Sequence, residues 1–188
     1  MEKKKKAKRA GDSFERGPKE RMPTVVPNKI PVVAIGASAG GIDAILQLLT
    51  ALPVSTGAAY VVLLHLPADK KSFMPELLQE RTGMKVVVAA DGLTLEPDVV
   101  HVVPPDAVAS VTGGQFVLGA RGETVAVPHV IDDFFLALAA HYQNKAIGVV
   151  LSGTATDGTA GIQAIKAEGG ITFAQDETAQ FKLESRIA

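Results

Sequence analysis

Short apolar runs rich in β-branched residues alternate with amphipathic segments along most of this chain. The apolar runs are residues 32–35, 60–64 and 146–151. The segments with helical periodicity that follow them are residues 41–52, 73–83 and 158–170. This alternation is typical of βαβ units, and strands without polar positions are typical of a parallel sheet that is buried on both faces. We therefore expect an α/β fold with a doubly wound, mostly parallel sheet flanked by helices.

The middle of the chain has a different pattern. Residues 85–119 contain short apolar runs separated by Asp-Gly, Glu-Pro-Asp, Pro-Pro-Asp and Gly-Gly, all of which favour turns. We interpret this region as an antiparallel hairpin excursion from the main sheet. A further amphipathic helix is predicted over residues 130–143, in which Phe134 and Phe135 are core candidates.

The first 29 residues differ from the rest of the chain in charge. They hold 10 Lys/Arg against 4 Asp/Glu, whereas the other 159 residues hold 9 against 16. So polar a segment cannot bury enough surface to offset the entropy lost on ordering, and we expect residues 1–29 to be a disordered basic tail and 30–188 to be one domain. The run KKKKAKR could contact nucleic acid or an acidic membrane surface. We favour a solvated leader or linker, and expect no nucleic-acid partner.

Cysteine is absent from the sequence. This excludes disulfides, thiolate metal sites and cysteine nucleophiles, and fits a reducing, intracellular setting. No apolar run reaches the roughly 18 residues that cross a bilayer, and the N-terminus has no signal-peptide pattern. We expect a cytoplasmic protein without membrane insertion.

Three residues with useful chemistry lie at or after the ends of predicted strands. Ser38 follows the first strand, His65 ends the second, and Asp157 follows the strand at 146–151. Residues at the carboxyl ends of parallel strands can meet at one edge of the sheet. A serine hydroxyl becomes a nucleophile when an imidazole takes its proton, and a carboxylate fixes and stabilises that imidazole. We therefore expect a Ser-His-Asp hydrolase triad that needs no cofactor.

The residues around Ser38 fit this interpretation. The segment GASAG, residues 36–40, matches G-x-S-x-G, in which small neighbours allow a tight strand-to-helix turn. The helix that follows directs backbone N–H groups at the same place, so those of Ala39 and Gly40 are candidate oxyanion donors. The chain order Ser, His, Asp differs from the Ser, acid, His order of α/β-hydrolases, which predicts another type of hydrolase.

Each member of this trio also has a simpler interpretation. A glycine-rich turn can bind phosphate, but G-x-G-x-x-G would need glycine at position 38, and the chain has no Walker A pattern. His65 could be an ordinary loop histidine, and Asp157 could be the N-cap of the helix that follows it. The coincidence of all three at strand ends favours the triad.

The other histidines are His101, His129 and His141. They have no partner histidine at ligand spacing, and the chain has no H-E-x-x-H. We expect surface or packing roles for them, and no metal site.

Four segments resemble the catalytic domain of the chemotaxis protein-glutamate methylesterases, the CheB family. AIGASAGG resembles the family's nucleophile segment, VVLLHLP its histidine segment, VVPPDAV its central Pro-Pro stretch, and GVVLSGTATDGTAGIQAIKAEGGITFAQD its aspartate segment. The resemblance covers roughly residues 31–188. It implies a doubly wound α/β domain that hydrolyses glutamyl methyl esters on the cytoplasmic helices of methylated chemoreceptors, with glutamine deamidation as a related activity.

Carried over residue by residue, the resemblance places the family's nucleophile on Ser38, its base on His65 and its acid on Asp157. Thr154 stands where the family has a methionine near the tetrahedral intermediate, so Thr154 joins Ala39 and Gly40 as candidate oxyanion or substrate-binding residues. The family usually has glutamine before its histidine, where this chain has Leu64.

The resemblance also bears on the limits of the domain. Residues 30–188 are expected to be a methylesterase-like catalytic domain that lacks its last C-terminal element, as the leading module of a methylesterase/methyltransferase fusion. Residues 1–29 stand where the family has a phosphoacceptor receiver domain, so we expect no phosphorylation control within this chain. One alternative is a non-catalytic signalling or binding module that retains the fold. Another is a nucleotide-binding domain that uses GASAGG as a phosphate cradle.

Overall fold

Six parallel strands form the central sheet of the computed structural model, in the order β3-β4-β2-β1-β7-β8. The structure describes residues 30–66, 72–121, 129–151 and 157–175. The strands of this sheet are β1 (Val32–Ser38), β2 (Ala59–His65), β3 (Lys85–Val88), β4 (Val99–Val102), β7 (Ala146–Leu151) and β8 (Ile171–Ala174). The helices are α1 (Ile42–Ala51), α2 (Met74–Gln79), α3 (Val130–Tyr142) and α4 (Thr159–Ala167), with short 3-10 turns η1 (Ala39–Gly41) and η2 (Gln143–Lys145).

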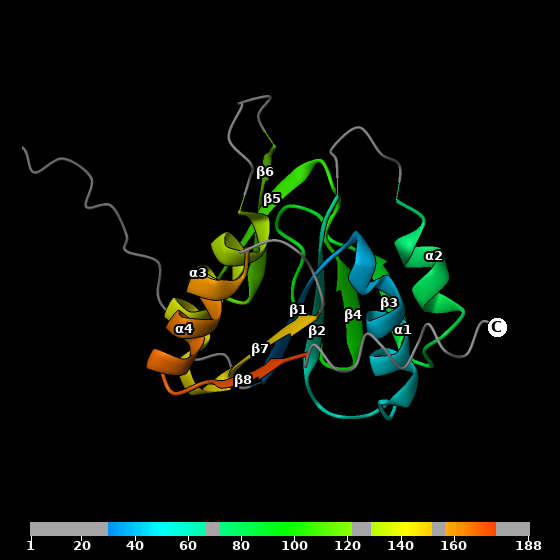
Figure 1. Ribbon diagram of the computed structural model, residues 1–188, viewed down its shortest axis with the longest axis horizontal. Helices are drawn as coiled ribbons and strands as arrows, with labels where there is room; N and C mark the ends of the chain where they lie inside the picture. Colours follow the sequence, from blue (N-terminus) through cyan, green and yellow to red (C-terminus); the bar gives the residue numbers. More distant parts are fainter. Residues whose placement is uncertain (1–29, 67–71, 122–128, 152–156, 176–188) are drawn as a thin grey trace, which may run out of the picture.

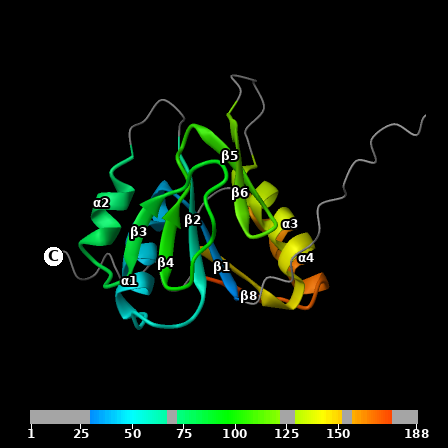
Figure 2. The ribbon, with the colours of Figure 1, turned by 180° about the vertical axis from the view of Figure 1, so that it is seen from behind.

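Helices cover both faces of the sheet. Figure 1 and the reverse view in Figure 2 show α1 and α2 on one side and α3 and α4 on the other. Along β2, Val61 and Leu63 point into a core with Phe134, while Val62 points into a second core with Leu49. This alternation arises because successive side chains of a strand face opposite ways, and it confirms the predicted doubly wound α/β fold.

The antiparallel part of the fold is smaller than predicted. In the middle region β5 (Ala107–Thr112) and β6 (Gln115–Ala120) pair antiparallel as a two-stranded hairpin, and Thr94 adds an isolated antiparallel bridge to Gln115. The prediction was wrong for β3 and β4, which pair parallel to one another within the main sheet. Residues 89–98 between them, which contain the Asp-Gly and Glu-Pro-Asp signals, form a crossover connection. Turn residues fit such a crossover as well as a hairpin, so local signals did not distinguish the two.

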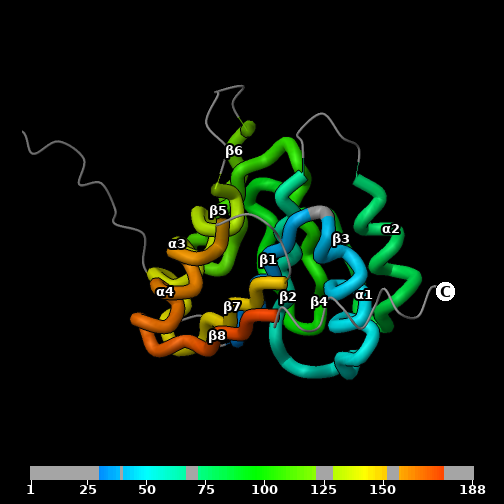
Figure 3. Tube along the Cα trace, in the orientation of Figure 1, coloured from blue at the N-terminus to red at the C-terminus, as the bar shows by residue number. Residues whose placement is uncertain are grey.

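Helix α3 packs between the β5–β6 hairpin and α4, as the tube in Figure 3 shows. Phe134 and Phe135 on this helix are fully buried, as predicted from the sequence. The start of α3 also lies against β1: a Cβ atom on Gly36 would come 2.4 Å from Ile131 Cγ2. Glycine at this position therefore lets the N-terminus of α3 approach the end of β1.

The parallel register brings the carboxyl ends of the central strands to one level. Ser38 is the register partner of His65 between β1 and β2, and Ala37 is the partner of Leu151 between β1 and β7. The residues that follow these strands therefore share one edge of the sheet. None of the helices among the described residues is long and apolar enough to span a membrane.

Candidate active site

Ser38 is the last residue of β1, and η1 and α1 follow it directly. Its backbone is extended, with φ −84° and ψ 179°, so this serine does not occupy the strained turn that carries the nucleophile of α/β-hydrolases. A Cβ atom placed on Gly40 would lie 3.9 Å from Ser38 Oγ. The hydroxyl therefore lies close to the start of the helical segment, beside the two residues predicted as oxyanion donors, Ala39 and Gly40.

His65 is the last residue of β2, and its side chain is 19% exposed. Its neighbour Leu64 is buried in the core beneath α1 and α2. Because successive residues of a strand face opposite sides, the leucine at position 64 does not share the face on which His65 lies.

Asp157 completes the group. Its carboxylate Oδ2 lies 3.7 Å from His65 Nδ1, and its side chain is only 2% exposed. This separation is longer than a hydrogen bond, which is common for catalytic contacts in resting enzymes. Ser38, His65 and Asp157 line one small hollow. The structure thus brings together the three residues that the sequence singled out, whereas Thr154 lies outside the described residues.

The carboxylate of Asp157 is held by the N-terminus of α3. Asp157 Oδ2 accepts a hydrogen bond from the amide of Ile131 at 3.1 Å, and Oδ1 accepts one from the amide of Asp132 at 2.9 Å. The alternative in which Asp157 caps its own helix is therefore wrong, because Gly158 is the N-cap of α4. First-turn amides have no acceptor within their helix, and here a residue distant in sequence supplies one. These donors and the helix dipole stabilise a negative charge at this point.

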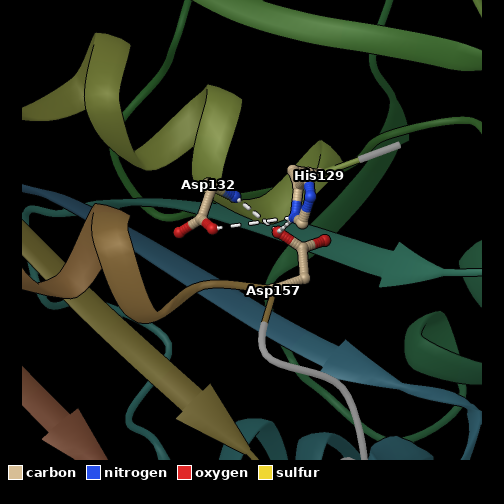
Figure 4. Close-up of side chains that lie close together, drawn as sticks. All are labelled: His129, Asp132 and Asp157. Carbon is tan, nitrogen blue, oxygen red and sulfur yellow. Dashed lines mark hydrogen bonds and ion pairs between the residues drawn. The ribbon is translucent and has the colours of Figure 1, made fainter. Parts of the chain in front are cut away.

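Two further residues lie around the same carboxylate, and Figure 4 shows them with Asp157. His129 Nδ1 is 4.0 Å from Asp132 Oδ2 and 4.0 Å from Asp157 Oδ1. The potential ligand atoms of the three residues lie within 4.8 Å of one another, which is a donor set that could hold a metal. Both carboxylates, however, accept hydrogen bonds from first-turn amides, where the helix dipoles favour anions. Capping thus accounts for this cluster without a cation.

The association of His129 with the two aspartates was not predicted from the sequence. The spacing of His129 and Asp132, three residues apart at a helix start, was the one local signal for it. The neighbouring Asp133 shows how negative this region is: desolvation by burial raises the pKa of its carboxyl group, and the charge of Asp157 raises it further.

Arg121 was also missed. Its Nη1 donates hydrogen bonds to the carbonyl oxygens of Leu66, at 2.6 Å, and Pro105, at 3.0 Å. The guanidinium thereby fastens the residue that follows His65 to the loop between β4 and β5. A single arginine after a strand carries no sequence signal for such a contact.

The two remaining histidines have the packing and surface roles that the sequence predicted. His101 is buried beside Phe116 and donates from Nδ1 to the carbonyl of Tyr60 at 3.0 Å. Burial lowers the pKa of His101. His141 lies on the surface, where its Nε2 is 3.3 Å from Thr112 Oγ1.

Comparison with known proteins identifies the family of this chain. The family model described as CheB methylesterase matches residues 33–183. The chain belongs to the CheB methylesterase family. The CheB methylesterase catalytic domain of Thermotoga maritima has the same fold, with a TM-score of 0.70 and 29% sequence identity over 79% of this chain and 80% of that one.

Two curated relatives carry the name protein-glutamate methylesterase/protein-glutamine glutaminase. The protein from Moorella thermoacetica is 36% identical over 161 residues, which are 79% of this chain and 36% of the relative. One from Bordetella avium, numbered 1, is 38% identical over 154 residues, which are 77% of this chain and 43% of the relative. The chain thus spans less than half the length of these CheB-family relatives.

Proposed function

We propose that this CheB-family domain is a protein-glutamate methylesterase, which hydrolyses methyl esters of glutamate side chains on a chemoreceptor. The observation that carries the proposal is the convergence of Ser38, His65 and Asp157 on one hollow, with His65 Nδ1 3.7 Å from the carboxylate. The names of the relatives supply the substrate class. They also suggest deamidation of glutamine, which requires the same attack on a carbonyl carbon.

In the proposed mechanism Ser38 Oγ attacks the ester carbonyl carbon while His65 accepts the hydroxyl proton. Since Nδ1 of His65 faces Asp157, Nε2 is the nitrogen that serves the serine. The tetrahedral intermediate then collapses, the bond to the methoxy group breaks, and His65 returns the proton so that methanol leaves. Water attacks the acyl-serine by the same route, which releases the glutamate side chain and restores the hydroxyl.

Asp157 orients His65 and stabilises the imidazolium that forms during the attack. Its burial and its two backbone donors suit that role, because they favour the ionised carboxylate in a fixed position. The amides of Ala39 and Gly40 directly follow the nucleophile, and we assign them to the oxyanion, with Thr154 as a further substrate-binding residue. No step of this mechanism requires a cofactor.

The substrate enters from the open edge of the sheet. Because Ser38, His65 and Asp157 line a small hollow, the substrate presents a side chain to it and keeps its backbone outside. We infer that the partner is a cytoplasmic helix of a methylated chemoreceptor, which exposes glutamyl esters on its surface, and that the protein works in the cytoplasm.

The test is methanol release from methylated receptor membranes by the purified chain and by Ser38→Ala. We expect release by the wild type and a rate lowered about 10³-fold or more in the variant, as for loss of a triad nucleophile. A fluorophosphonate probe should label Ser38 in the wild type only. Equal methanol release by both proteins, or a wild type that neither labels nor releases methanol, would contradict the proposal; the latter result would favour a non-catalytic binding module.

A further inference from the structure

We infer that Asp132 is a positioning residue for the esterase reaction, which holds Asp157 in place by fastening the first turn of α4. This inference rests on the proposed function, because it assigns Asp157 to the acid of the triad. The observation behind it is that the N-termini of α3 and α4 cap one another, each through an aspartate carboxylate. Asp157 precedes α4 but accepts hydrogen bonds from α3, and Asp132 belongs to α3 but accepts one from α4.

The contacts form a closed ring. The amide of Asp132 donates to Asp157 Oδ1 at 2.9 Å, and Asp132 Oδ1 accepts a hydrogen bond from the amide of Gly161 at 2.7 Å. The backbone from Asp157 to Gly161 closes the ring. Both amides lie in first turns, where no acceptor within the helix is available. Each helix therefore supplies the cap that the other one lacks.

The cap on Gly161 lies close to Asp157, because α4 begins just after Asp157. Only Gly158 lies between Asp157 and the first residue of α4, and its φ of +101° is in the left-handed region that favours glycine. The close approach of α4 to α3 also needs glycine at position 161, where a Cβ atom would come 2.3 Å from Phe135 Cβ. The position of Asp157 thus follows from where the first turn of α4 is held.

Loss of the Asp132 carboxylate leaves the buried Gly161 amide without its acceptor. Such a group recovers a partner only if the helix end moves or water enters. We expect the helix end to move, which displaces Asp157 from His65, now 3.7 Å away. The expected result is a lower turnover number with an unchanged Michaelis constant, since the Asp132 carboxylate is directed at α4.

The experiment compares Asp132→Ala with Asp132→Asn and with the control Asp133→Ala, all in the full chain. Asparagine keeps an oxygen that can accept from Gly161. Asp133 lies in the same helical turn, and its carboxylate is not one of the groups that form the ring, so its alanine variant removes a carboxylate from this turn and leaves the contacts of the ring in place. We measure kcat and KM for methanol release, and the rate of fluorophosphonate labelling, which reports activation of Ser38 without the receptor.

We expect Asp132→Ala to lower kcat and the labelling rate together, about 10- to 100-fold, the range known for small displacements of catalytic groups. KM should stay the same, and Asp132→Asn and Asp133→Ala should keep near wild-type rates. Wild-type kcat in Asp132→Ala, an equally inactive Asp132→Asn, or a loss in Asp133→Ala as large as that in Asp132→Ala would each overturn the inference. Ser38→Ala is measured in parallel. If it releases methanol as fast as the wild type, the proposed function itself is wrong; if it is inactive, an unexpected result for the Asp132 variants overturns only the role of Asp132.

A second variant covers the case in which Asp132→Ala does not fold. The hydroxyl of Asp132→Ser is one bond shorter than the carboxylate, so it cannot reach the Gly161 amide while α4 stays in place. We expect reduced kcat in this variant and recovery in Asp132→Asn. Full kcat in the folded serine variant would overturn the inference in the same way.

Discussion

Ser38 and His65 are register partners at the ends of adjacent parallel strands, β1 and β2. Their backbones therefore lie side by side, and both side chains line the hollow into which Asp157 also projects. Parallel pairing of the two strands thus brings together two residues that are 27 positions apart in the sequence. The nucleophile and base of the proposed mechanism are thus positioned by the central hydrogen-bonded ladder of the sheet, which is buried beneath helices on both faces.

A double-mutant cycle tests whether Ser38 and His65 act as one unit. We expect Ser38→Ala and His65→Ala each to lower kcat about 10³-fold or more, and the double variant to be no slower than either single one, because a proton relay is lost whichever partner is removed. The measurement is methanol release under substrate saturation. If the loss of kcat in the double variant equalled the product of the two single losses, the two residues would act independently.

Asp157 should affect stability as well as activity. In Asp157→Ala two first-turn amides of α3 lose their acceptor, and we expect a loss of about 1–2 kcal/mol in the free energy of unfolding, the usual cost of a missing helix cap. Asp157→Asn keeps one oxygen acceptor, so its stability should be closer to wild type. Its kcat should still fall about 10⁴-fold, the loss typical when asparagine replaces the aspartate of a Ser-His-Asp triad. Urea unfolding and methanol release measure the two effects. A fully active asparagine variant would remove Asp157 from the mechanism.

Gly161→Ala tests the close contact between α3 and α4. An added Cβ atom would meet Phe135 Cβ at 2.3 Å, and overpacking of this kind costs about 1–3 kcal/mol. We expect the variant to be destabilised despite the better helix propensity of alanine. Gly119→Ala is the matched control, since a Cβ there meets nothing within 4 Å, and its unfolding midpoint should stay near that of wild type. Equal midpoints for the two variants would contradict the contact.

His101 should make the protein less stable in mild acid. Burial lowers its pKa in the folded state, whereas an unfolded histidine titrates near pH 6.5. As the pH falls below about 6.5, the unfolded chain therefore binds a proton that the folded chain does not, and stability decreases until the folded pKa is reached. No contribution from this group is expected above that window.

The measurement is the urea midpoint between about pH 8 and pH 5, in the wild type and in His101→Asn, whose amide can still donate to Tyr60 without titrating. We expect a shallower pH dependence in the variant. His141→Asn, at an exposed site, should retain the slope of the wild type. An identical slope in His101→Asn would show that another group causes the acid sensitivity.

The parallel core of the fold could be predicted because its signals are local. The apolar runs that became β1, β2 and β7 are uninterrupted by polar residues, and each is followed by helical periodicity. The pairing of β3 with β4 could not be predicted in this way. Their four-residue strands and the turn residues between them are compatible with a hairpin or a crossover, and packing in the main sheet decides between the two.

The candidate site also has parts with local sequence signals and parts that depend on packing. Ser38, His65 and Asp157 could be singled out from the sequence because residues with suitable chemistry stand at strand ends, where the topology gathers them. The contacts of Asp157 with α3, and of Asp132 with α4, could not be found, because a helix cap is normally supplied by the residues just before the helix. Arg121 likewise contacts Leu66 and Pro105, and His129 contacts Asp157, all of which lie far away in the sequence.

The amino-acid pattern alone determined the α/β class and the three residues of the proposed reaction, since strand periodicity and strand-end chemistry are properties of short segments. Only the tertiary structure decided which amides donate hydrogen bonds to Asp157. It also decided that the carboxylate of Asp132 caps α4. The physical reason is that hydrogen bonds between separate helices depend on where those helices pack, and glycines at positions 36, 158 and 161 permit that close approach here.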